Sequence, residues 1–168
     1  MKKKLFTSFP VTAHTDYITQ GSTFVVIQGQ KEDGISYIKQ AIQKGATKIV
    51  LEKNIQLSDE MFLFLKNHAI EIEYVDDTRK ALALLSAQAA DNPAQKLKIF
   101  GVSGTKGKTS TTWMLTHLLK TFGKKVACLT TAEVFLESGN HCNELAEFDC
   151  SSGFSTPQPD YLHQFLKL

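Results

Sequence analysis

The chain has 168 residues, of which 42% are hydrophobic and 21% charged, an ordinary composition for a globular protein with a buried core. Its 19 basic and 17 acidic residues leave a net charge of +2, and Arg79 is its only arginine. This balance argues against nucleic acid or an anionic membrane as a partner, and no apolar run approaches the roughly 20 residues that cross a bilayer. The three cysteines form no CxxC pair and leave an odd thiol, which favours a reducing, cytoplasmic compartment.

Strand and helix patterns alternate through the first half of the chain. Runs rich in β-branched and aromatic residues predict strands over 23–27, 48–52 and 70–75. Apolar residues at helical spacing predict the helices between and after these strands. Their boundary signals are Gly45 at a helix end, Ser58 at a helix start, and Asp76, Asp77 and Thr78 before a helix over about 79–90.

A break follows at Asp91-Asn-Pro93. Proline has no amide donor and restricts the residue before it, so it ends the preceding helix. We therefore place a domain boundary here, between residues 1–94 and residues 95–168.

Beyond the boundary the pattern begins again. It predicts a strand over 98–102, a helix over about 108–122 and a strand over 125–130. This is a βαβ unit, in which the two strands are expected to pair in parallel. Thr156-Pro157 is typical of a further helix start.

A glycine-rich stretch at residues 101–110, GVSGTKGKTS, lies between the predicted strand and helix. Glycines let backbone amides curl around an anion, and a helix start adds unpaired N–H groups. Lys108 is expected to reach the β- and γ-phosphates of a nucleotide, and the Thr109 hydroxyl to ligate Mg²⁺. The strict pattern GxxxxGK[ST] is not met, because Val102 stands where its first glycine would be. The candidate phosphate-binding residues are Gly104, Thr105, Lys106, Gly107, Lys108, Thr109 and Ser110.

The stretch GVSGTKGKTSTT resembles the ATP loop of the Mur ligases, which build the peptide stem of bacterial cell-wall precursors. Folylpolyglutamate synthases share this type of loop, and the Mur family usually has asparagine at the position of Lys106. Other stretches resemble MurE-like ligases, which add the third residue of the stem. These stretches are QGSTFV at 20–25, GQKEDG at 29–34, DTRKAL at 77–82 and STP at 155–157.

The resemblance implies an α/β protein with two parts. Residues 1–94 would form a small N-terminal α/β substrate domain that binds the UDP end of the precursor, and residues 95–168 the start of a P-loop parallel-sheet ATPase domain. The implied function is that of an ATP-dependent ligase of peptidoglycan synthesis in the cytoplasm, with ATP and Mg²⁺ as cofactors and UDP-N-acetylmuramoyl-peptide and an amino acid as substrates. Lys108 would be catalytic and Thr109 would bind the metal. The residues implied in substrate binding are Gln30, Lys31, Glu32, Ser155 and Thr156.

The sequence also departs from the family. The uridine-side DSR motif reads Asp16-Tyr-Ile18 here, Ile35 stands where a polar residue is usual, and Phe154 stands where asparagine often occurs. The family's later acidic Mg²⁺ ligand, carbamylated lysine and C-terminal domain have no counterpart before Leu168. We therefore expect the chain to be inactive alone, either as a monomer or as a subunit completed by another chain.

Three alternatives stay open at this point. A non-catalytic nucleotide-binding or regulatory module is favoured by the lost DSR motif and the short length. A folylpolyglutamate-synthase-like ligase fits less well, because in that family the ATP loop lies close to the chain start. An unrelated P-loop kinase is disfavoured by Val102 and by the long stretch before the loop.

Overall fold

The computed structural model describes residues 7–29, 34–131, 134–135 and 157–168. The chain divides into two compact units. The first unit comprises Thr7–Leu97 together with Gln158–Leu168, and the second comprises the described residues of Lys98–Pro157. None of the helices in the described ranges is both long enough and apolar enough to cross a membrane.

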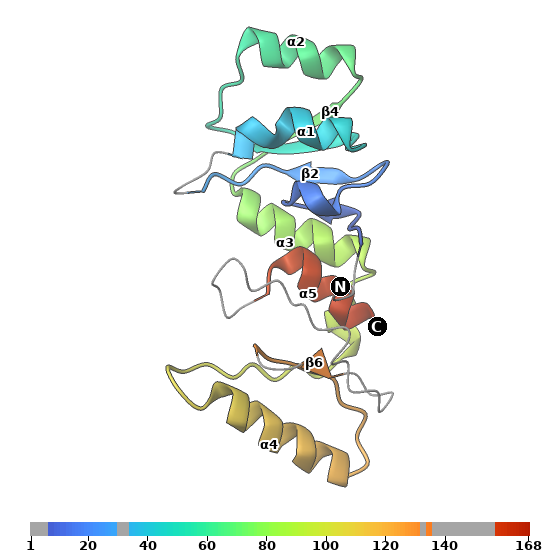
Figure 1. Ribbon diagram of the computed structural model, residues 1–168, viewed down its shortest axis with the longest axis vertical. Coiled ribbons are helices and arrows are strands. Elements are labelled where there is room, and N and C mark those ends of the chain that lie inside the picture. Colours follow the sequence, from blue (N-terminus) through green and yellow to red (C-terminus); the bar gives the residue numbers. More distant parts are fainter. Residues whose placement is uncertain (1–6, 30–33, 132–133, 136–156) are drawn as a thin grey trace. The chain divides into compact units, whose positions relative to one another are not determined.

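The first unit is built around a four-stranded parallel sheet with the order β1-β2-β3-β4 (Figure 1). Its strands are β1 (Val11–Thr12), β2 (Thr23–Val25), β3 (Lys48–Glu52) and β4 (Glu71–Val75). In the middle of the sheet, Ile49 of β3 is the register partner of both Phe24 and Ile72. The predicted α/β class is confirmed, and the strand predicted over 48–52 forms with those bounds, whereas the one predicted over 23–27 is shorter.

Helices cover both faces of this sheet (Figure 1). They are α1 (Ile38–Gln43), which follows a 3₁₀ turn at Gly34–Tyr37, α2 (Asp59–Asn67) and α3 (Thr78–Ala89). Ile49 and Leu51 of β3 pack with Leu65 of α2, whereas Val50 packs with Leu82 of α3. A strand buried on both faces is expected to be continuously apolar, which is why residues 49–51 carry no polar side chain.

The predicted helix boundaries are confirmed. The Ser58 side chain accepts a 3.2 Å hydrogen bond from the backbone N–H of Met61, and the Asp77 carboxylate accepts one of 3.0 Å from the N–H of Lys80. Gly45 follows the end of α1 with a φ of +108°, a conformation that glycine adopts without strain.

The last helix, α5 (Pro159–Lys167), belongs to the first unit and packs against α3. Near its start, the Asp160 carboxylate accepts a 2.8 Å hydrogen bond from the hydroxyl of Thr12 in β1, and near its end Lys167 pairs with Asp91 at 3.2 Å. The helix begins two residues beyond the predicted start, again with proline in its first turn. Because a helix from the end of the chain completes the first unit, the assignment of functional domains to 1–94 and 95–168 stays a prediction.

The second unit contains α4 (Lys108–Thr121) and two short strands, β5 (Cys128–Leu129) and β6 (Val134–Phe135). The helix predicted over about 108–122 is confirmed, and Gly123 follows it with a φ of +68°. β5 is shorter than the strand predicted over 125–130, and it pairs with β6 in antiparallel fashion.

The strand predicted over 98–102 is wrong, and so is its parallel pairing with 125–130. The segment is irregular, and the Ile99 and Phe100 side chains are 57% and 62% exposed. A strand needs a neighbour for its backbone N–H and C=O groups, and no strand in the described part of the chain pairs with this segment. An apolar pattern alone therefore did not suffice to make it a strand.

Candidate functional site

The loop predicted to bind phosphate leads directly into α4. Gly104 has a φ of +152° and Gly107 a φ of +81°. Both values are positive, and positive φ favours glycine over residues with a side chain. Gly107 is the N-cap residue of α4 and has no side chain with which to cap the first amides of the helix. A Cβ at Gly107 would meet nothing within 4 Å, so the backbone conformation, and not crowding, requires glycine there.

The first turn of α4 presents backbone amides to the loop. The first hydrogen bond of the helix runs from the Thr111 N–H to the Gly107 carbonyl, at 2.9 Å. The amides of Lys108, Thr109 and Ser110 come before that bond, and helix geometry gives such amides no partner within the helix. Together with the positive end of the helix dipole, they form an arrangement that binds anions.

The side chain of Lys108 folds back over the loop. Its Nζ donates a 2.7 Å hydrogen bond to the carbonyl oxygen of Gly104, and the residue is half-buried. Thr105 and Lys106 are exposed on the turn between these two residues. The ammonium group therefore lies beside the glycine backbone, where a charged phosphate oxygen would be a stronger acceptor than the neutral carbonyl it now contacts.

Thr109, the predicted metal ligand, is the second residue of α4 and is half-buried. No group of three or more His, Cys, Asp or Glu side chains in the described ranges is placed to hold a metal ion. Mg²⁺ commonly takes only one or two protein ligands and completes its shell with phosphate oxygens and waters. A hydroxyl beside amides that are free to bind phosphate fits that mode.

The predicted substrate-binding residues Gln30, Lys31, Glu32, Ser155 and Thr156 lie outside the described residues, and their role stays a prediction. The structure does describe the backbone on either side of residues 30–33. A Cβ at Gly34 would lie 2.6 Å from the carbonyl oxygen of Ile27, so these two backbones are in close contact and only glycine fits.

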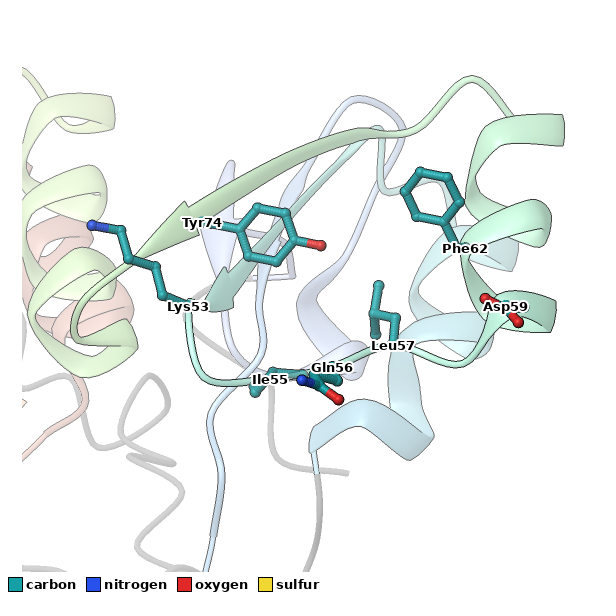
Figure 2. Close-up of a pocket in the computed structure, with 7 residues that line it drawn as sticks. All are labelled: Lys53, Ile55, Gln56, Leu57, Asp59, Phe62 and Tyr74. Atoms are coloured by element: carbon teal, nitrogen blue, oxygen red, sulfur yellow. The ribbon is translucent and has the colours of Figure 1, made fainter.

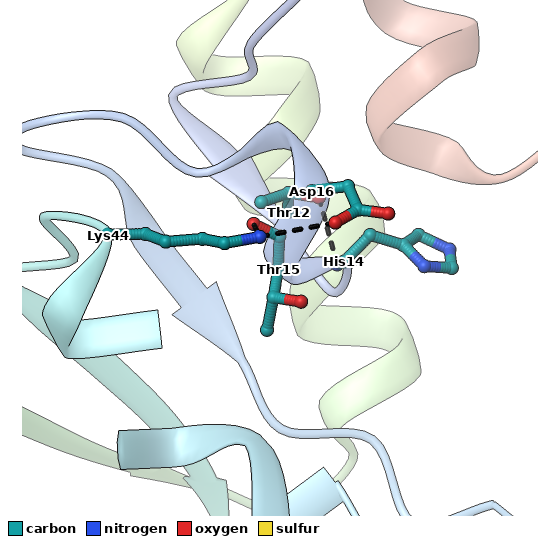
Figure 3. A network of polar contacts seen from close by, with 5 residues as sticks. All are labelled: Thr12, His14, Thr15, Asp16 and Lys44. Atoms are coloured by element: carbon teal, nitrogen blue, oxygen red, sulfur yellow. Dashed lines mark hydrogen bonds and ion pairs between the residues drawn. The ribbon is translucent and has the colours of Figure 1, made fainter. Parts of the chain in front are cut away.

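Asp16, Tyr17 and Ile18 occupy the positions compared above with the DSR motif. The Lys44 ammonium donates hydrogen bonds of 3.1 Å to the Asp16 carboxylate and 2.9 Å to the carbonyl of Thr15 (Figure 3). The Tyr17 ring packs against that of Phe9, and Ile18 is buried in the core. Tyr17 and Ile18 thus contribute to packing, and the Asp16 carboxylate is engaged by a lysine of the same unit.

Sequence reasoning missed a shallow pocket of about 570 Å³ in the first unit (Figure 2). Its lining residues are Lys53, Ile55, Gln56, Leu57, Asp59, Phe62 and Tyr74. At its edge, Lys53 pairs with Asp76 at 2.8 Å, and this ion pair lowers the pKa of the Asp76 carboxyl. Phe62 and Tyr74 are 54% and 45% exposed, but as single aromatic residues in a helix and a strand they gave no signal in the sequence. None of the predicted site residues lines this pocket.

No family model matches the chain. Its sequence is 32% identical over 150 residues to the UDP-N-acetylmuramoyl-L-alanyl-D-glutamate–2,6-diaminopimelate ligase of Clostridium perfringens, a match that covers 89% of this chain and 27% of the relative. It is 34% identical over 159 residues to the UDP-N-acetylmuramyl-tripeptide synthetase of Deinococcus radiodurans, which covers 94% of this chain and 29% of the relative. The chain belongs to the Mur ligase family.

A solved structure of the Mur ligase family is also similar. The MurF ligase of Thermotoga maritima in complex with ADP is 26% identical, with a TM-score of 0.46, and the match covers 73% of this chain and 25% of that one. The chain therefore spans between a quarter and a third of the length of these three Mur ligases. The family resemblance predicted from the sequence is confirmed.

Proposed function

We propose that this chain supplies the ATP-binding loop and the precursor-binding domain of an ATP-dependent ligase that adds an amino acid to UDP-N-acetylmuramoyl-peptide in peptidoglycan synthesis. One observation carries the proposal: a loop with glycines at positive φ enters the uncapped start of α4, with the Lys108 ammonium 2.7 Å from the Gly104 carbonyl. The two relatives support it, since their names describe them as a ligase and a synthetase of UDP-N-acetylmuramoyl peptides.

The proposed reaction begins with transfer of the γ-phosphate of ATP to the carboxylate of the precursor. The amino group of the incoming amino acid then attacks the acyl phosphate, which forms the amide bond and releases phosphate. Two anions must approach each other in the first step, so fixed positive charge is needed. Lys108 would hold the β- and γ-phosphates and the first amides of α4 would orient them. Mg²⁺, bound through the Thr109 hydroxyl, would neutralise phosphate charge.

The precursor is proposed to bind through the predicted residues Gln30, Lys31, Glu32, Ser155 and Thr156. The domain assignment goes with this proposal: residues 1–94 take the UDP end and residues 95–168 contribute to the ATP site. We also propose that this chain by itself binds Mg-ATP without turnover.

The alternatives are less well supported. A folylpolyglutamate-synthase-like ligase is not favoured, because the relatives described above are named for muramoyl peptides. A non-catalytic nucleotide-binding module would share the loop, and it differs in having no affinity for the UDP-linked precursor. Titration of the chain with UDP-N-acetylmuramoyl-dipeptide separates the two.

The test is calorimetric titration with Mg-ATP of the native chain and of the Lys108→Ala variant. The lost charge-assisted hydrogen bonds are worth about 1.5–3 kcal/mol, so the affinity is expected to fall roughly tenfold to a hundredfold. Lys124→Ala is the matched control, because it removes an equal charge from an exposed lysine beyond the other end of α4. Equal affinity of the native and Lys108→Ala chains would refute the role of the loop.

A further inference from the structure

The pocket described above is built within one β-α-β segment of the first unit. Its lining residues lie between positions 53 and 74, in the connection from β3 to α2, at the start of α2 and on β4. Its volume of about 570 Å³ falls within the roughly 300–1,000 Å³ that is usual for small-ligand pockets. Because this segment carries neither the proposed ATP-binding loop nor the predicted precursor-binding residues, the pocket is a candidate site for a ligand of its own.

Two aromatic rings form the walls of this pocket. Phe62 projects from α2 and Tyr74 from β4 into the same space, and Leu57 lies below them in the view of Figure 2. Both rings are about half exposed, whereas Ile55, which also lines the pocket, is buried. The face of an aromatic ring is electron-rich and attracts organic cations. The walls therefore favour a ligand that combines a flat or apolar body with positive charge.

The charged groups around the pocket leave one carboxylate without a counter-charge. The Lys53 side chain extends away from the two rings and pairs with Asp76 at 2.8 Å. In the first turn of α2, Glu60 pairs with Lys39 at 3.4 Å. Asp59 lines the pocket from the same turn, and its side chain makes no ion pair or hydrogen bond with any residue in the described ranges. The pocket thus offers a free carboxylate beside its aromatic walls, which is complementary to a cation.

A guanidinium group fits these features better than an ammonium group does. A guanidinium is planar and stacks on aromatic faces, and its N–H fork binds a carboxylate through two parallel hydrogen bonds. It is also more weakly hydrated than an ammonium group, so it loses less when it enters a pocket that is open to water. The Gln56 amide and the Tyr74 hydroxyl, whose side chains also form no hydrogen bond within the described part of the chain, provide further acceptor oxygens.

We propose that this pocket binds a small molecule that carries a guanidinium group, stacked against the rings of Phe62 and Tyr74 and paired with the Asp59 carboxylate. The ligand is small because the walls and the carboxylate all belong to one pocket of side-chain dimensions. This site goes beyond the proposed ligase function and does not depend on it.

The test is a titration of the full, isotope-labelled chain with N-acetyl-arginine amide, followed by NMR. We expect saturable shifts of the amides of residues 55–62 and 74, with a midpoint of about 1 mM. N-acetyl-citrulline amide has nearly the same shape without the charge, and N-acetyl-lysine amide has the same charge on an ammonium group. Both are expected to bind at least fivefold more weakly.

Three results would overturn the proposal. The first is the absence of saturable shifts at up to roughly ten times the expected midpoint. The second is equal binding of the citrulline compound, since a neutral ligand would then suffice. The third is binding of a five-residue peptide with a central arginine more than tenfold tighter than the small compound, since the ligand would then be a polypeptide.

A variant pair makes the test specific to the carboxylate. Asp59→Asn keeps the shape and removes the charge, and it is expected to weaken binding of N-acetyl-arginine amide at least fivefold. Glu60→Gln is the matched control, because it removes an equal charge from the same helical turn at a residue that does not line the pocket. Equal affinities of these two variants would contradict the role of Asp59. Tyr74→Leu keeps an apolar wall without the ring and should weaken binding roughly threefold. Unchanged Mg-ATP binding by all three variants separates this site from the proposed nucleotide site.

Discussion

The hydroxyl of Thr12 donates a 2.8 Å hydrogen bond to the carboxylate of Asp160, across 148 positions of the sequence. Thr12 is fully buried and Asp160 is 2% exposed. The other carboxylate oxygen accepts a 2.8 Å hydrogen bond from the N–H of Tyr161, so both oxygens have a partner. A buried carboxylate is tolerated when it is hydrogen-bonded in this way, and the contact fastens α5 to β1.

We predict that Thr12→Val destabilises the first unit by about 1–3 kcal/mol, because the shape is kept while a buried carboxylate oxygen loses its donor. The four tyrosines all lie in the first unit and the single tryptophan lies in the second. Urea unfolding followed by near-UV circular dichroism of the tyrosines therefore reports on the first unit. Thr47→Val, at an exposed threonine of the same unit, is the control and should change stability by less than about 0.5 kcal/mol. Equal losses from the two variants would show that the contact with Asp160 contributes nothing.

A pH dependence follows from His163 on α5. Burial lowers its pKa below the ordinary value of 6.5, and its Nδ1 has no hydrogen-bond partner among the described residues. The unfolded chain therefore takes up a proton near pH 6.5, whereas the folded chain takes it up only at lower pH. Stability rises with pH wherever the unfolded state binds more protons, so the first unit loses stability as the pH falls from 7 through 6.5.

The His163→Phe variant isolates this effect. It removes the titrating group and keeps a ring at the α5 position, so its tyrosine-monitored stability should fall less between pH 7 and pH 5.5 than that of the native chain. Parallel stability curves for the two proteins over this range would contradict the prediction.

The proposed ATP-binding loop, residues 101–110, offers a matched pair of glycines. Gly107 has a φ of +81°, where a side chain costs about 1–2 kcal/mol, whereas Gly101 is not at positive φ and has no atom within 4 Å of a Cβ built on it. We predict that Gly107→Ala weakens Mg-ATP binding roughly fivefold or more and speeds exchange of the first amides of α4. Gly101→Ala should bind as the native chain does. Similar titration curves for the two variants would mean that the conformation of Gly107 is not needed for the site.

Local signals predicted the first unit well, since its elements depend on residues close in sequence. Ser58 and Asp77 cap helices because their oxygens reach amides three residues ahead. The run at 49–51 is apolar because both faces of β3 are covered. The position of Lys108 beside its loop was also foreseeable, since Gly104 is only four residues earlier in the chain.

The errors share a physical cause, which is dependence on distant partners. The stretch 98–102 has the composition of a strand, but whether it becomes one depends on a neighbour that the pattern does not supply. Asp160 gave no signal in the sequence, because nothing local indicates that its partner is Thr12. The pocket around Phe62 and Tyr74 likewise arises only when α2 and β4 come together (Figure 2).

The contact between Thr12 and Asp160 also sets an order of events during synthesis. A ribosome makes β1 well before α5, which follows the proposed ATP-binding loop in the chain. Until α5 has emerged, the side of α3 against which it packs stays uncovered. Contacts of such long sequence separation form late and slow folding, so the interval exposes apolar surface to chaperones or to other chains.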